Sequence, residues 1–103
     1  MNKYGNRTVR ADGFTFDSQA EHRRYQALRL MERAGIIKDL DVHRRFLLHA
    51  GIRYECDFSY IEDGKLVAED VKGVETAVFR LKKKLFLVDF PQWELRVIPA
   101  KDV

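Results

Sequence analysis

The chain has little cysteine and little proline: Cys56 is its only cysteine, and 103 residues include two prolines. One cysteine cannot form a disulfide within the chain or a cysteine-rich zinc site, and this usage suggests a reducing compartment. Nothing approaches the roughly 18 consecutive apolar residues that span a membrane, and residues 1–10 lack the apolar segment of a signal peptide. We therefore expect a cytoplasmic protein with no membrane partner.

Repeats, low-complexity tracts and flexible linkers are also missing, so one domain over residues 1–103 is expected. Hydrophobic residues make up 46% of the chain and aromatic residues 12%, which predicts a folded core rather than a disordered tail. The formal net charge is +3. This mild basic excess permits a polyanionic partner without requiring one.

Two segments have the apolar spacing and the end signals of amphipathic helices. The first begins at the N-cap Ser18 and ends at Gly35, and the second runs from Thr76 to Val88, before Pro91. In the second helix, the expected apolar stripe consists of Val78, Leu81, Leu85 and Val88, broadened by Phe79 and Phe86.

Alternating or apolar patterns predict four strands, at 36–43, 52–61, 65–72 and 93–98. Glu62-Asp63-Gly64 predicts a hairpin between the second and third strands, whereas the boundaries around "RRFLLHAG" stay open. Residues 1–14 are expected to form a basic arm or a hairpin around "ADG". The order α-β-β-β-α-β predicts an α/β fold, with a central mixed sheet flanked by helices.

Two acids lie where neighbouring strands should bring them together. Asp57 precedes Asp70 by thirteen residues, and the hairpin between them would place both carboxylates at one end of the sheet. Facing carboxylates repel unless a cation lies between them, and their oxygens suit Mg²⁺ or Mn²⁺. Lys72 shares a face with Asp70, since side chains in a strand alternate. It could stabilise a phosphate or position an attacking water.

A third acid, Glu21, and the pair of Asp70 and Lys72 also have purely structural interpretations. Glu21 lies in the first helical turn, where Ser18-Gln19-Ala20-Glu21 matches a capping box. Asp70 and Lys72 alone would be a weak surface ion pair.

The remaining candidate residues are an alternative acid, one cysteine and three histidines. Glu69 could replace Asp70 as a ligand if the strand were bulged, although the parity with Lys72 favours Asp70. Cys56 is expected to be a small core residue. The histidines show no ligand spacing, and we expect structural or surface roles for His22, His43 and His49.

The combination of "CDF" at Asp57, "EDVKG" with Asp70 and Lys72, and the upstream Glu21 resembles the PD-(D/E)XK nuclease superfamily. The α-β-β-β-α-β order is also that of its restriction-endonuclease-like core. More narrowly, "KYGN", "DGFTFDSQAEHRRYQAL", "DVHRRF" and "EDVKG" are similar to small phage-encoded endonucleases related to Holliday-junction resolvases. Cys56 replaces the proline of the superfamily's name, a common departure.

The resemblance implies a Mg²⁺ site, with Mn²⁺ as a substitute. Its ligands would be Asp57, Asp70, the backbone carbonyl of Val71 and, as a possible further ligand, Glu21. Lys72 would assist the attacking water, and cleavage would leave a 5′-phosphate. A phage-encoded chain would act in the cytoplasm of the host cell.

Basic residues flank this acidic centre and are the candidate contacts to DNA phosphates. They comprise Lys3, Arg7, Arg10, Arg23, Arg24, Arg44, Arg45, Arg80, Lys82, Lys83 and Lys84. Such contacts position a backbone without reading sequence, so recognition of DNA shape is expected. The main hypothesis is a homodimeric, metal-dependent endonuclease that cuts four-way DNA junctions. The alternatives are another nuclease of the superfamily (branched-DNA, nicking or restriction-type) and a non-catalytic nucleic-acid-binding module.

Overall fold

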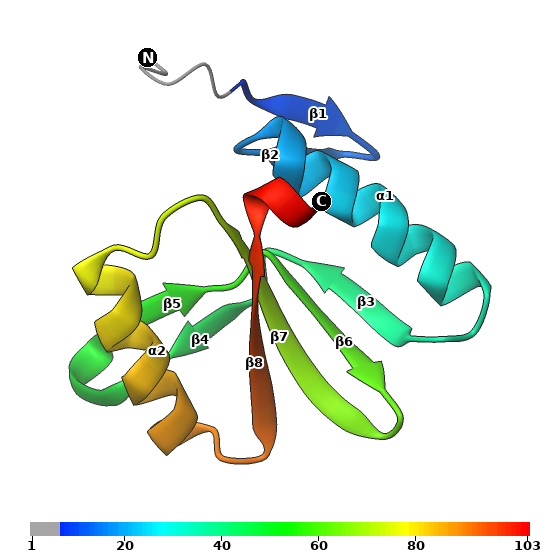
Figure 1. The fold of residues 1–103 in the computed structure, drawn as a ribbon. Coiled ribbons are helices and arrows are strands. Elements are labelled where there is room, and N and C mark those ends of the chain that lie inside the picture. The colour runs from blue at the N-terminus through cyan, green and yellow to red at the C-terminus, as the bar shows by residue number, and fades with distance from the viewer. Residues whose placement is uncertain (1–6) are drawn as a thin grey trace.

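The centre of the fold is a four-stranded mixed sheet in the order β3-β6-β7-β8 (Figure 1). The structure is a computed structural model that describes residues 7–103, so Lys3 lies outside the described residues. The helices are α1 (Gln19–Arg33) and α2 (Ala77–Asp89). The strands are β1 (Val9–Ala11), β2 (Phe14–Phe16), β3 (Lys38–Val42), β4 (Arg45–Leu47), β5 (Arg53–Glu55), β6 (Phe58–Glu62), β7 (Lys65–Lys72) and β8 (Trp93–Pro99).

Strand β7 is one of the two inner strands of the sheet. It pairs antiparallel with β6 through the predicted tight turn, and parallel with β8 on its other side. The parallel pairing requires a long crossover, which α2 supplies. The expected α/β class with a mixed sheet and flanking helices is confirmed.

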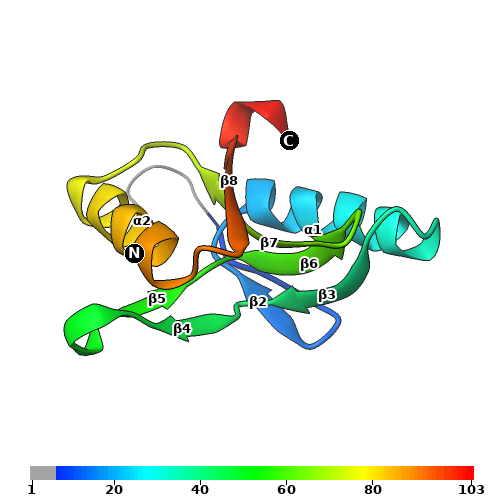
Figure 2. The same cartoon turned by 90° about the horizontal axis from the view of Figure 1, so that it is seen from below.

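The two faces of the sheet carry separate cores. Val67, Glu69 and Val71 of β7 point toward α1, where an aromatic cluster forms around Phe16, Tyr25 and Phe58. The alternate residues, from Ala68 through Asp70 to Lys72, point toward α2 and the small β4–β5 hairpin. Figure 2 shows these layers from below. The alternation expected for this strand is confirmed.

The first helix begins and ends as predicted. The Ser18 hydroxyl accepts a hydrogen bond from the Glu21 N–H at 3.1 Å, and Gly35 has the positive φ of +77° typical of a residue just after a helix. A hairpin precedes the helix, with Asp12 and Gly13 both at positive φ in its turn. The hairpin expected around "ADG" is therefore confirmed.

The prediction of a single strand at 52–61 is wrong. The chain forms β5 and β6, which belong to different sheets and are separated by Cys56 and Asp57. At this break, the Cys56 N–H donates to the Arg44 carbonyl, and the His43 N–H donates to the Asp57 carbonyl, both at 3.0 Å. Backbone pairing thus continues while the chain passes from one sheet to the next. The structure also adds β4, which pairs with β5.

The apolar stripe expected on the second helix is rotated. Phe79 and Phe86 are its buried side chains, whereas Val78, Leu81 and Val88 are 63%, 55% and 74% exposed. The reason is aromatic packing: Phe86 contacts Phe46 edge-to-face with ring centroids 4.8 Å apart, and rings bury more apolar area than valine does. None of the helices in residues 7–103 is long and apolar enough to cross a membrane.

Candidate active site

The site lies where the pairing of β6 with β7 stops before β7 itself ends. The β6–β7 ladder ends at Phe58 opposite Glu69, whereas β7 continues beside β8 as far as Lys72 opposite Pro99. Past Phe58, a side chain replaces the neighbouring strand: Asp57 Oδ2 accepts a hydrogen bond from the Val71 N–H at 2.8 Å. The sheet edge thereby fixes the Asp57 carboxylate in one place.

The Asp70 carboxylate lies beneath Asp57 and is 1% exposed. Its Oδ1 accepts a hydrogen bond from the Asp57 N–H at 3.1 Å, and its Oδ2 accepts one from the Tyr54 hydroxyl. Asp57 and Asp70 are therefore neighbours, as predicted. In this arrangement, Asp70 uses both oxygens to hold other protein groups.

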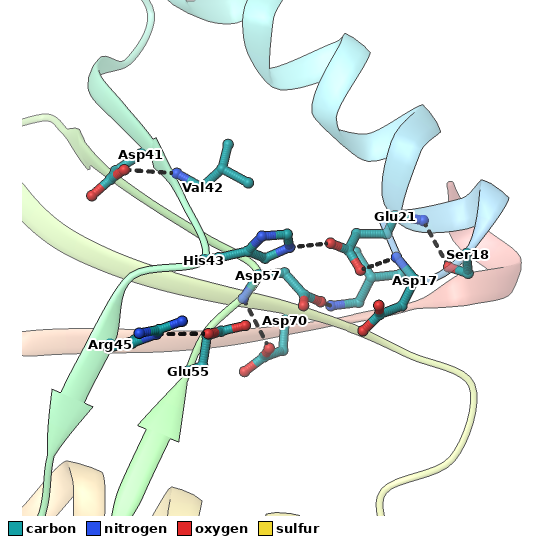
Figure 3. Close-up of polar contacts among 11 residues, drawn as sticks. Asp17, Ser18, Glu21, Asp41, Val42, His43, Arg45, Glu55, Asp57 and Asp70 are labelled. Carbon is teal, nitrogen blue, oxygen red and sulfur yellow. Dashed lines mark hydrogen bonds and ion pairs between the residues drawn. The ribbon is translucent and has the colours of Figure 1, made fainter. Parts of the chain in front are cut away.

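Glu21 reaches the same place from α1 and is 4% exposed (Figure 3). Its Oε2 lies 3.4 Å from the Asp17 nitrogen, and its Oε1 shares a hydrogen bond with Nε2 of His43 at 2.8 Å. Its backbone N–H is the one that Ser18 caps. Glu21 thus takes part in the helix cap through its backbone, while its carboxylate faces His43 and Asp57.

His43 is a member of the site that the sequence did not reveal. One ligand atom from each of Glu21, His43 and Asp57 lies within 4.8 Å of the other two. We expected only a structural or surface role for His43. The sequence could not predict its proximity to Glu21 and Asp57, because the three residues lie far apart along the chain. Strand register carries the missing signal: Val42 pairs with Phe58, so the next residues, His43 and Asp57, lie side by side.

Burial raises the pKa values of all three carboxyls, and repulsion from the other two adds to the effect at Asp57. Burial, followed by the nearby charges of Asp70 and Glu21, raises the pKa of Asp57 to about 8. Burial also raises the pKa of Glu21, against the opposing effect of its hydrogen bond to His43. The pKa of Asp70 is raised by burial too, although the Tyr54 hydroxyl favours its ionised form. The cluster therefore favours bound protons or a bound cation over free negative charge.

A cavity of about 430 Å³ opens over these residues. Its lining includes Glu21, Asp57, Val71 and Lys72, and also the basic residues Arg7 and Arg23. The Lys72 Nζ lies 4.5 Å from the centre of the Phe79 ring, a cation–π contact on the α2 side of the cavity. Of the predicted residues, the cavity thus gathers Glu21, Asp57, Val71 and Lys72, with Asp70 beneath.

The same chain matches a family over nearly its whole length. The profile of DUF1064, described as a protein of unknown function, matches residues 1–101. The chain belongs to the DUF1064 family. No curated protein and no solved structure matches it.

In this DUF1064 chain, Glu69 and Arg24 form an ion pair away from the site. The Arg24 guanidinium contacts both Glu69 carboxylate oxygens at 2.7 Å, and the Tyr60 hydroxyl donates to Glu69 at 2.6 Å. Glu69 is fully buried. These contacts direct Glu69 away from Asp57 and toward α1, and they show that the Arg24 guanidinium, predicted as a DNA contact, is engaged with a buried acid within the protein.

The other predicted phosphate contacts fall into two groups. Arg7 and Arg23 lie at the cavity, whereas Arg10 is exposed on β1 and is not among the lining residues. The second group lies on or beside α2 and is partly engaged within the protein. Arg80 donates to the Glu75 carbonyl at 2.8 Å, and Lys83 lies 4.0 Å from Glu75.

Two more basic side chains of the DUF1064 chain make internal contacts. The Arg44 guanidinium lies over the Trp93 ring at 5.1 Å, and Arg45 pairs with Glu55 at 3.2 Å. Lys82 lines a smaller pocket shared with Lys72, and Lys84 is exposed. Within residues 7–103, the basic side chains that line the acidic cavity are therefore Arg7, Arg23 and Lys72.

Proposed function

We propose that this protein is a metal-dependent, structure-selective DNA endonuclease of the PD-(D/E)XK type, with a restriction-endonuclease-like core. The order α1-β3-β6-β7-α2-β8 supports this assignment, with the β1–β2 and β4–β5 hairpins as additions. The observation that carries the proposal is the meeting of Glu21 and Asp57, from distant parts of the chain, at a cavity that Lys72 and Arg23 also line. Acids beside bases in one cavity suit a metal ion together with a phosphate.

The donor groups fit a divalent cation. Glu21 and Asp57 offer carboxylate oxygens at the cavity, and Val71 lies against Asp57, where its backbone carbonyl is a further oxygen donor. Asp70 orients Asp57 and can become a ligand itself once one of its two hydrogen bonds opens. Carboxyls whose pKa is raised by burial and by each other gain most from a positive ion between them.

A bound Mg²⁺ or Mn²⁺ would supply a more acidic water molecule and neutralise charge on the scissile phosphate. The protein holds the rest of the reacting groups. Lys72 lies between the cavity and the Phe79 ring, and its ammonium can donate to the phosphate or the attacking water. Hydrolysis forms a bond from the water oxygen to phosphorus and breaks the bond to the 3′ oxygen, which takes a proton. The products are a 5′-phosphate and a 3′-hydroxyl.

Four-way junctions are the substrate we propose, and a homodimer is the form that cuts them. Each chain offers one such cavity, whereas symmetric resolution of a junction needs two cuts, which a two-fold dimer supplies. Arg7 and Arg23 border the cavity and would hold the adjacent phosphates. Contacts of this kind follow DNA shape rather than base sequence.

The test is cleavage of a synthetic four-way junction, compared with flap, nicked and linear duplexes of the same sequence, with Mg²⁺ or Mn²⁺ present. We expect the junction to be cut preferentially, and Asp57→Asn and Lys72→Ala to lower the rate by at least about a hundredfold. Asp41→Asn is the matched control, because Asp41 also accepts a backbone N–H but is exposed and lies outside the cavity. Equal cutting of linear duplex would contradict the resolvase assignment, and full activity of Asp57→Asn would contradict the site.

A further inference from the structure

His43 is held at the acidic cavity by both its backbone and its ring. Its N–H donates to the Asp57 carbonyl at 3.0 Å, and its ring lies beside Phe16 with the ring centres 6.1 Å apart. The ring is thereby aimed at Glu21, whose Oε1 lies 2.8 Å from Nε2. The His43 side chain is still 26% exposed, so the imidazole is accessible from solvent.

We propose that His43 is a protein ligand of the metal site, which makes the site a mixed nitrogen–oxygen centre selective for divalent transition ions over Mg²⁺. The inference rests on the proposed function only for the location of the site, not for the reaction. Carboxylate and carbonyl oxygens suit Mg²⁺, whereas imidazole nitrogen suits ions such as Co²⁺, Ni²⁺ and Zn²⁺. One histidine among the ligands therefore changes which ion the site prefers.

The spacing of the donor atoms supports coordination by all three residues. Donors about 2.1 Å from one ion can lie up to about 4.2 Å apart, because opposite ligands are separated by two bond lengths. The ligand atoms of Glu21, His43 and Asp57 lie within 4.8 Å of one another. Small side-chain rotations close that difference. The ion would then replace the hydrogen bond that now joins His43 to Glu21.

The competing interpretation is that His43 only orients Glu21 through this hydrogen bond. His43→Gln separates the two roles, because a glutamine amide can still donate to Glu21 but offers no imidazole nitrogen. His49→Gln is the matched control: His49 is also paired with an acid, Asp89, but its side chain is 80% exposed and lies outside the cavity. Metal binding that depends on any surface histidine would respond to both substitutions.

The experiment is calorimetric titration of the metal-free, full-length protein with Co²⁺ and with Mg²⁺, alongside the visible absorption of bound Co²⁺. We expect wild type and His49→Gln to bind Co²⁺ at least about tenfold more tightly than Mg²⁺, and His43→Gln to lose most of that preference while keeping its Mg²⁺ affinity. Asp57→Asn should weaken both ions. An unchanged ratio of Co²⁺ to Mg²⁺ affinity in His43→Gln would overturn the proposal.

A second measurement on wild type keeps the test valid if His43→Gln fails to fold. With ¹⁵N-labelled histidine rings, stoichiometric Zn²⁺ should shift the Nε2 resonance of His43 through direct coordination and leave the ring signals of His49 in place. An unchanged Nε2 resonance of His43 in the metal-bound protein would contradict the assignment. Co²⁺ binding through His43 without DNA cleavage would refute the proposed function and leave this inference intact. Cleavage with Mg²⁺ together with an unchanged metal preference in His43→Gln would refute this inference and leave the proposed function intact.

Discussion

Asp57 should make the metal-free protein less stable, because its carboxylate is buried beside two other acids. Its pKa rises from 3.8 to about 8, and full ionisation in the folded state therefore costs about 6 kcal/mol. Because the folded state binds this proton more tightly than the unfolded state, its contribution to stability is complete below pH 4 and is lost as the pH rises to 8. Raised pKa values at Glu21 and Asp70 act in the same direction.

Asp57→Asn removes this charge and keeps an oxygen that can accept the Val71 N–H. Relaxation of the neighbouring acids reduces the full value, so we expect a gain of about 2 kcal/mol at pH 8.5, or a rise in Tm of about 8–16 °C. At pH 5 the folded wild-type carboxyl is protonated and only the unfolded chain is ionised, so the gain should shrink to about a third of its value at pH 8.5.

The assay is thermal unfolding followed by circular dichroism in the presence of a chelator, at pH 5 and at pH 8.5. Asp41→Asn is the control, since its exposed carboxylate accepts the Val42 N–H and should respond little at either pH. If Asp57→Asn were no more stable than wild type at pH 8.5, the buried charge would not carry the cost assigned to it. The variant is thus expected to be more stable and catalytically inactive.

Three further predictions concern ions and polar contacts around the site. Adding Mn²⁺ at pH 8 should raise the Tm of wild type and leave that of the Asp57→Asn variant unchanged, which differential scanning fluorimetry would measure. Arg24→Ala should lower the free energy of unfolding in urea by about 3–5 kcal/mol, because it leaves the buried Glu69 without its counter-charge. Arg23, the neighbouring residue, is exposed, so Arg23→Ala should leave urea unfolding nearly unchanged. It should instead lower the salt dependence of DNA binding by about one ion. Tyr54→Phe should cost about 1–3 kcal/mol at neutral pH in the same urea assay, because Asp70 loses one of its two hydrogen-bond donors.

The sequence allows much of this framework to be predicted because local rules dominate it. The cap at Ser18, the glycine after α1 and the alternation of β7 are local signals that the structure follows. They place Glu21 at the start of a helix and Asp70 two residues before Lys72, and the tight turn before β7 brings Asp57 alongside.

What the sequence did not predict depends on contacts between distant segments. The break at Cys56 is stabilised by the hydrogen bond from its N–H to the Arg44 carbonyl, and no pattern within residues 52–61 predicts it. His43 joins the site only because β3 runs beside β6 in a particular register. The rotation of α2 has a similar origin, since aromatic partners on β4 select Phe86 over the exposed Leu81.

The ion pair between Arg24 and Glu69 has a consequence for the geometry of the acidic cavity. Arg24 lies about one helical turn after Glu21, and Glu69 immediately precedes Asp70, so the pair joins the same two elements that carry the acids. Helix and strand cannot slide past each other without separating two charges in an apolar interior. The distance between Glu21 and Asp70 is thereby set by an ion pair one turn away, which holds helix and strand in place while the acids themselves stay free to change partners.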